Sequence, residues 1–376
     1  MSIWIAILAI LRESWLTLRA EKLFKVVLGL NVLVIVAYMS IGFDDTGVSL
    51  FFGLTHVESE FVQSGSPLSR TLYLGIYSAF IINLWLAWAA SILALISTSS
   101  IFPSFLREGA VELVMSRPTR RVTIFFVKYV GGLLFVMIQV GIFTLGAFLA
   151  AGWRIDVWDP AIFLAIPLVT LFYSYLFCVD VLVGVITRST LTALLATLLF
   201  WFGTFGIHTA DDLLSANLRR MEESVSRAEN RLEELASERD VATAEGETSE
   251  AADAAHWMTG PQEEIEALNN ALGQLRPWQT TIEAIRFVIP ETKRTLALLH
   301  RSLERNMEVS LTDLMTGAAF QDEDEPPRQP DDDEIVQRKI IERDNEIPAW
   351  RIIGKSLIFE AAVLGLALWI FQRRDY

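Results

Sequence analysis

The chain alternates between long apolar runs and polar segments. Six runs come close to, or exceed, the roughly 20 residues that a helix needs to cross a bilayer. In order, they cover residues 26–43, 73–97, 125–152, 161–186, 191–207 and 352–371. This pattern predicts an all-α membrane protein with six transmembrane helices.

The N-terminal residues 2–25 carry a different pattern. Apolar side chains recur there at intervals of three and four residues, and charged side chains fall mostly between them. The apolar positions are Ile3, Trp4, Ile7, Leu8, Leu11, Trp15 and Leu18. The spacing predicts an amphipathic helix in the membrane interface, and the alternative is a ragged start of the first span. The charges between Arg12 and Lys25 favour the interface, because charged side chains are costly in the hydrocarbon core.

Residues 102–128, FPSFLREGAVELVMSRPTRRVTIFFVK, form a polar and basic segment between two apolar runs. Short loops rich in Lys and Arg stay in the cytoplasm, so this loop sets the predicted topology. Alternation of the six spans then places both termini in the cytoplasm. It places residues 44–69, which hold four acidic and no basic residues, outside. We expect a multi-pass protein of the plasma membrane, in a bacterium the inner membrane.

Most of the acidity lies in one segment. Mean hydropathy is +0.40, although the formal net charge is −14. Residues 208–349 hold 32 acidic and 15 basic residues, whereas the rest of the chain holds 13 and 16. A near-neutral membrane part therefore carries a strongly acidic soluble part, which the predicted topology places outside the cell.

Heptad spacing runs through this acidic segment. One apolar series follows Asp211, and a second follows the helix breakers Gly246, Gly260 and Pro261. The first series is Leu214, Leu218, Met221, Val225, Ala228, Leu232 and Leu235, and the second is Ile265, Leu268, Leu272, Leu275 and Ile282. We predict an antiparallel, coiled-coil hairpin of two helices, reaching roughly 45–50 Å at about 1.5 Å per residue. The alternative is that the seam pairs with the same seam of a second subunit.

The segments after the hairpin complete the domain plan. Apolar positions between Leu296 and Leu314 predict one or two amphipathic helices packed against the membrane. Residues 321–334, QDEDEPPRQPDDDE, are too acidic and proline-rich to bury apolar surface. We therefore expect a membrane domain (1–207), an extracytoplasmic coiled-coil and helical domain (208–320), an acidic flexible linker (321–349), and a sixth span with a cytoplasmic tail (350–376).

Polar residues inside the apolar runs are the candidates for function within the membrane. They are Asn31, Asn83, Gln139, Asp180 and Glu360. Polar groups within spans usually face a bundle interior or a cavity, because lipid cannot satisfy them. Asn83, Gln139, Asp180 and Glu360 could line a path or form a gating contact. The alternative is interhelical hydrogen bonding that fixes the packing.

The sequence offers little catalytic chemistry. It contains no G-x-x-x-x-G-K-[ST] phosphate loop, no H-E-x-x-H and no G-x-S-x-G. The four histidines have no metal-ligand spacing, and the single cysteine, Cys178, lies in an apolar run. The acidic segment would repel nucleic acid. We therefore expect neither an enzyme nor a cofactor site in this chain.

The loop at 102–128 also resembles a family signature. REGAVELVMSRP (residues 107–118), with Arg120 and Lys128 after it, is similar to the cytoplasmic loop of ABC transporter permeases of the ABC-2, or type-2 exporter, class. That loop reads E-x-G-T-x-E-L-L-L-S-x-P-x-S-R and precedes a Gly-Lys pair and the third span. Ala110 and Val127 stand here where Thr and Gly are common. The resemblance covers the membrane part and the FQRRDY ending, but the long acidic insertion lies outside the common pattern.

The resemblance implies a permease subunit that forms the path for export. ATP would be bound by a separate ABC-type ATPase subunit, and a second permease copy or a homologue would complete the path. Residues 108–116 would form a coupling helix that docks on the ATPase, with Pro118 after it as a stop. The coupling residues would be Arg107, Glu108, Gly109, Glu112, Arg117, Pro118 and Arg120.

Two alternatives stay open beside this interpretation. The loop could be an ordinary cytoplasmic loop that only fixes topology. The chain could be a non-transporting scaffold or sensor in the membrane that recruits an extracytoplasmic protein through its coiled coil. Only the transporter needs both a coupling helix and an ATPase.

Overall fold

The computed structural model describes residues 22–58, 62–106, 120–245, 253, 255–305 and 346–373. The chain divides into two compact units. The first comprises residues 1–204, 290–328 and 347–376, and the second comprises residues 205–289 and 329–346. The predicted interfacial helix (2–25) and acidic linker (321–349) lie almost entirely outside the described residues.

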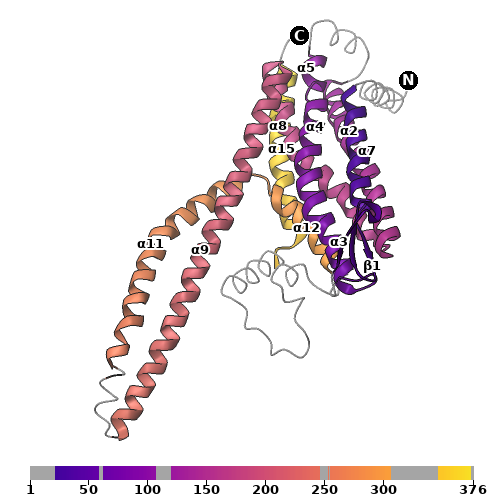
Figure 1. The fold of residues 1–376 in the computed structure, drawn as a ribbon. Helices are drawn as coiled ribbons and strands as arrows, with labels where there is room; N and C mark the ends of the chain where they lie inside the picture. The colour runs from indigo at the N-terminus through magenta and orange to yellow at the C-terminus, as the bar shows by residue number, and fades with distance from the viewer. Residues whose placement is uncertain are drawn as a thin grey trace. The chain divides into compact units, whose positions relative to one another are not determined.

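The first unit is a bundle of apolar helices (Figure 1). Its helices are α2 (Lys22–Met39), α3 (Pro67–Ile76), the π-helix η2 (Tyr77–Ala90), α4 (Ser91–Thr98), α5 (Ile101–Phe105), α7 (Arg121–Ile155), η3 (Pro160–Leu164), α8 (Ala165–Thr187), the first part of α9 (Thr190–Glu245), α12 (Thr292–Glu304) and α15 (Ala349–Arg373). Among the described residues, five helical segments are long and apolar enough to cross a membrane: Pro67–Phe105, Arg121–Ile155, Pro160–Thr187, Thr190–Ala244 and Ala349–Arg373.

The all-α membrane fold is confirmed. The first predicted span corresponds to a shorter apolar helix, Lys25–Met39. It ends before residue 43, because the chain enters a strand at Gly42. That this shorter helix also crosses the membrane, which would make six spans, stays a prediction.

A small antiparallel sheet follows α2, in a segment predicted only as an outer loop. Its strands are β1 (Gly42–Asp44), β2 (Gly47–Leu50) and β3 (Thr55–Glu58), in the order β1-β2-β3. Asp44 pairs with Gly47, so Asp45 and Thr46 form a two-residue hairpin turn. The side chain of Arg154, near the end of α7, donates to the carbonyl of Ile41 over 3.0 Å and so ties α7 to the start of the sheet.

Helix α8 lies at the centre of the first unit. It packs against α7, α12 and α15. Its sequence, AIPLVTLFYSYLFCVDVLVGVIT, is apolar on every face, as is typical of a helix enclosed by others. Tyr173, Tyr175, Phe177 and Cys178 have no exposed surface. Ser174 and Asp180, two polar residues of α8, are buried there as well.

Helix α12 is one of the amphipathic helices predicted after the hairpin. Leu296, Leu299 and Leu303 are buried, with spacings of three and four. The helix packs against α8, η3 and α15, so its apolar face completes the bundle. The rest of the predicted amphipathic stretch, beyond residue 305, lies outside the described residues.

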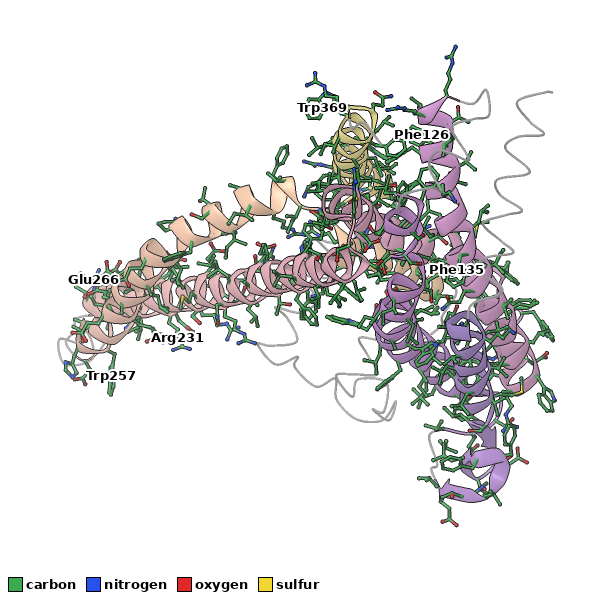
Figure 2. All side chains as sticks on the ribbon, turned by 90° about the horizontal axis from the view of Figure 1, so that it is seen from above. Phe126, Phe135, Arg231, Trp257, Glu266 and Trp369 are labelled. Atoms are coloured by element: carbon green, nitrogen blue, oxygen red, sulfur yellow. The ribbon has the colours of Figure 1, made fainter. Side chains whose placement is uncertain are left out.

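The second unit is an antiparallel hairpin of two long helices, the later part of α9 and α11 (Thr259–Val288) (Figure 1). Arg286 forms an ion pair with Asp211, and Arg276 lies 3.6 Å from Glu222. From the Asp211–Arg286 pair to the Glu222–Arg276 pair, the residue number rises by 11 on α9 and falls by 10 on α11. The two helices therefore run in opposite directions. Arg231, Trp257 and Glu266 lie toward the end where the two helices are joined (Figure 2). The predicted antiparallel arrangement is confirmed, and coiled-coil packing stays a prediction.

Candidate functional site

Glu360 lies near the middle of α15 and faces the interior of the bundle. The buried residues of α15 follow at intervals of three and four: Ile352, Ser356, Glu360, Leu364, Ala367 and Phe371. This spacing sets one face of α15 against α8. Glu360 is 8% exposed, so its carboxylate must be satisfied by neighbouring side chains.

Two hydroxyl groups from two other helices satisfy this carboxylate. Tyr129, on α7, donates to Glu360 Oε1 over 2.6 Å, and Ser174, on α8, donates to Oε2 over 2.9 Å. The Tyr129 hydroxyl also lies 3.2 Å from the Ser174 carbonyl oxygen. We call Tyr129, Ser174 and Glu360 the carboxylate cluster. It joins the three helices α7, α8 and α15 in the interior of the bundle.

Aromatic packing holds Tyr129 in place. Its ring stacks on that of Phe177, with centroids 5.3 Å apart and planes inclined by 11°. A Cβ on Gly132, one turn along α7, would lie 2.6 Å from the Phe177 ring. The glycine therefore allows the ring to approach α7 closely, and the ring fixes the direction of the Tyr129 hydroxyl.

The structure places the other predicted membrane residues at separate positions. Gln139 and Asp180 are each 2% exposed, and neither Gln139 Oε1 nor Asp180 Oδ1 has a hydrogen-bond partner among the described residues. Asn31 is fully buried and accepts from Trp85 Nε1 over 2.9 Å. Asn83 departs from the expectation, because its side chain is exposed. Path or gating roles for Asn83, Gln139, Asp180 and Glu360 stay predictions.

A second polar cluster joins α12 to α15. Lys355 forms an ion pair of 2.6 Å with Glu291, and Arg294 lies 3.8 Å from the same carboxylate. The backbone N–H of Glu291 donates to Ser356 Oγ over 2.9 Å. Since the Glu291 side chain is 7% exposed, the pair fixes the start of α12 on α15. We call Glu291, Lys355 and Ser356 the α12 anchor.

Sequence reasoning found Glu360 but missed its partners and the whole α12 anchor. A carboxylate in an apolar run is rare, whereas Tyr129 and Ser174 are ordinary residues of apolar helices. Glu291 and Lys355 lie at the edges of their helices, where charge is expected. Only their proximity in the structure, across 64 residues of sequence, shows that they are partners.

The predicted coupling loop lies almost entirely outside the described residues. This applies to Arg107, Glu108, Gly109, Glu112, Arg117 and Pro118. Arg120 is described, as an exposed residue with extended backbone directly before α7. The next residue, Arg121, donates from its guanidinium to the carbonyl of Gln372 over 3.1 Å. The start of α7 and the end of α15 therefore meet where this loop ends.

The described residues offer no metal centre, because no three His, Cys, Asp or Glu side chains among them are grouped to hold an ion. Comparison with known proteins gives one match. The model of a family described as ABC-2 family transporter protein matches residues 8–376. No curated protein and no solved structure matches the chain.

Proposed function

Because the chain belongs to the ABC-2 family of transporter proteins, we propose that it is the permease subunit of an ABC exporter driven by a separate ATPase subunit. The observation that carries this proposal is the family match, which extends over the membrane helices and the hairpin alike. As a member of this family, the chain is a multi-pass membrane protein and not itself catalytic. The absence of a phosphate loop from the sequence supports ATP binding on another chain.

The loop at residues 107–120 is the proposed contact with the ATPase. It connects α5, which ends at Phe105, to α7, which begins at Arg121. Glu108 and Glu112 would lie one turn apart on a short helix and meet basic groups of the ATPase. Movement of this loop would act directly on α7 and, through the Arg121–Gln372 hydrogen bond, on the end of α15.

The hydrogen bonds of the carboxylate cluster would oppose movement of α7 and α15 along α8. Helices α7 and α15 carry Tyr129 and Glu360, and both contact the central helix α8 through Ser174. Shifting α7 or α15 along α8 would have to exchange these hydrogen bonds. We propose that ATP-driven closure shifts the spans between two arrangements, and that the carboxylate cluster is formed in one of them and broken in the other.

The charge distribution supports an orientation. Among the described residues, Arg120, Arg121 and Arg373 lie at the same end of the bundle, since Arg121 donates to the carbonyl of Gln372. We place this end in the cytoplasm with both termini. The acidic hairpin of α9 and α11 then lies on the extracytoplasmic side. It would cap the exit of the path, receive cargo or dock an extracytoplasmic protein.

The test is capture of an ATPase from the native membrane in mild detergent. Three chains are compared: the natural one, a double variant Glu108→Arg with Glu112→Arg, and a control variant Glu263→Arg with Glu264→Arg. The control makes the same charge change at exposed positions of α11. We expect an ABC-type ATPase with the natural and control chains, and its loss with the loop variant.

The other outcomes are equally definite. Recovery of the ATPase with all three chains would keep the permease and remove the loop as its contact. Recovery of extracytoplasmic proteins alone, without an ATPase from any chain, would refute the permease and favour the membrane scaffold.

A further inference from the structure

The hairpin of α9 and α11 exposes large apolar side chains at one of its ends. We call residues 205–222 of α9 and 274–288 of α11 the hairpin base. Its exposed large apolar side chains are Phe205, Leu213, Trp278, Ile285, Phe287 and Val288. Beyond the base, the described residues of the hairpin expose only two such side chains, Val241 and Trp257. The apolar surface is therefore concentrated in the base.

The charges of the hairpin follow the same division. The hairpin base holds four acidic and four basic residues, whereas residues 223–273 hold 13 acidic and three basic ones. Two charges of the base, Asp211 and Arg286, pair with each other, and their side chains are 7% and 11% exposed. A neutral, apolar base fits surroundings of low polarity, whereas the acidic remainder needs water.

On α11 the exposed apolar residues share one face. Trp278, Ile285 and Val288 follow one another at intervals of seven and three residues, which brings them to the same side of a helix. Arg286 reaches in another direction, toward Asp211 on α9. The second helix of the hairpin therefore carries an apolar stripe on a side other than the one that meets α9.

The length of α9 gives the depth of the hairpin base. In the proposed orientation, α9 begins at Thr190 among the cytoplasmic headgroups, directly after the polar turn that contains Arg188. At about 1.5 Å per residue, Asp211 lies roughly 32 Å along α9. A bilayer is about 40–45 Å thick with its headgroups. The Asp211–Arg286 pair is therefore at the depth of the outer leaflet.

Trp278 lies farther out than this pair. It is two residues from Arg276, which pairs with Glu222. The antiparallel register therefore puts Trp278 near residue 220 of α9, roughly 45 Å along that helix, or about 42 Å across the membrane for a tilt of about 20°. This is the depth of the outer headgroups.

The α12 anchor gives a second and separate measure of depth. The backbone N–H of Glu291 donates to Ser356 Oγ over 2.9 Å. Ser356 is 16 residues along α15 from Gln372, near the cytoplasmic end, which corresponds to roughly 24 Å. Three residues of chain from Glu291 to Val288 can add at most about 11 Å. The last turn of α11 therefore also falls within the thickness of the bilayer.

We propose that the hairpin base is embedded in the outer leaflet, with the last turn of α11 among lipid acyl chains and Trp278 at the headgroups. Lipid covers apolar side chains at this depth, and Trp is enriched at the headgroup level. The Asp211–Arg286 pair neutralises two charges that would be costly there. The proposal goes beyond the permease role and rests only on the proposed membrane orientation of α9.

The experiment is spin labelling of the full chain, reconstituted in liposomes of phosphatidylethanolamine and phosphatidylglycerol. Cys178, the single cysteine, is changed to Ser, and labels are placed at Phe287→Cys, Trp278→Cys and the control Trp257→Cys. Trp257 matches Trp278 in exposure, at 67% and 64%, and lies toward the end where the two helices are joined (Figure 2). Collisions with oxygen, which dissolves in lipid, are compared with collisions with a water-soluble nickel chelate.

The ratio of oxygen to nickel collisions should rise from residue 257 to 278 and again to 287. Equal ratios at 287 and 257 would put the base in water and overturn the proposal. A label at 287 that neither reagent reaches would mean that protein covers this surface, which also overturns it. Labels at Ile285→Cys and Val288→Cys repeat the measurement, so that one poorly folded variant does not decide the result.

The same labels test whether α11 descends into the leaflet. Nine residues separate Trp278 from Phe287, or about 13 Å along the helix. The label at 287 should therefore be deeper than the label at 278, by no more than about 13 Å. Equal depths would mean that α11 lies flat on the surface, and they would overturn the embedded last turn.

Two further comparisons separate this proposal from the others. In intact cells, a membrane-impermeant maleimide should modify Glu264→Cys, an exposed position of α11, and protection until lysis would overturn the outer leaflet. A water-exposed base with normal ATPase capture overturns the lipid contact alone. Failed capture with an embedded base overturns the permease assignment alone.

Discussion

Replacing Tyr129 by Phe should weaken the packing of α15 against α7 and α8. The substitution removes the hydroxyl that donates to Glu360 Oε1 over 2.6 Å, and it keeps the ring that stacks on Phe177. Glu360 is 8% exposed, so water cannot easily replace the lost donor. Ser174 still donates to the other carboxylate oxygen, which limits the damage.

The magnitude follows from the environment of Glu360. A buried hydrogen bond to a charged group contributes about 1.5–3 kcal/mol in proteins generally. In membrane proteins, double-mutant cycles give about 0.6 kcal/mol on average and up to about 1.7. Because the carboxylate cluster lies within a predicted membrane bundle, we expect a coupling energy between Tyr129 and Glu360 of about 1–2 kcal/mol.

The assay is a double-mutant cycle on the free energy of unfolding in mixed detergent micelles. It compares Tyr129→Phe, Glu360→Gln and the double variant with the natural chain. A matched control pairs Glu360→Gln with Tyr77→Phe, whose hydroxyl lies 3.5 Å from the Ile162 carbonyl and not in the cluster. The control pair should be additive within about 0.3–0.5 kcal/mol. Additivity of the Tyr129 pair within the same limits would refute the cluster as an energetic unit.

Two further substitutions test two largely buried ion pairs, Lys355–Glu291 and Arg286–Asp211. Lys355→Met should lower the free energy of unfolding of the membrane unit by about 1–3 kcal/mol, because it leaves the buried Glu291 carboxylate without its closest partner. The Lys355 side chain is only a quarter exposed, so solvent screens this ion pair less than a surface pair. Adding Glu291→Gln should recover part of that loss in thermal unfolding, and no recovery would contradict the anchor. Arg286→Met should loosen the hairpin by leaving Asp211, which is 7% exposed, unpaired, seen as faster amide hydrogen exchange in residues 205–225. Exchanging the charges, with Asp211→Arg and Arg286→Asp, should restore slow exchange, and a failure to do so would count against the pair.

Periodicity of apolar residues was sufficient to predict the bundle and the hairpin. An apolar run of this length can bury its backbone polar groups in lipid only as a helix, so the positions of the membrane helices follow from composition. The heptad series after Asp211 likewise predicted two antiparallel helices, which the Arg276–Glu222 and Arg286–Asp211 pairs confirm. The strands between Gly42 and Glu58 were not predicted, because short strands with a polar hairpin turn resemble a loop in sequence.

What the sequence determined by itself was which side chains are costly in a membrane. Glu360, Asp180, Gln139 and Asn83 stand out in apolar runs because lipid cannot satisfy them. What only the tertiary structure decided was which of them finds a hydrogen-bond partner among the described residues. Glu360 receives two hydroxyl donors from helices far away in sequence, whereas Asn83 faces outward and has no partner within the described chain. Helical periodicity repeats along each helix, but the rotation of one helix against another depends on contacts between distant segments. Those contacts decide that Glu360 lies in an internal carboxylate cluster and that Asn83 lies on an exposed surface.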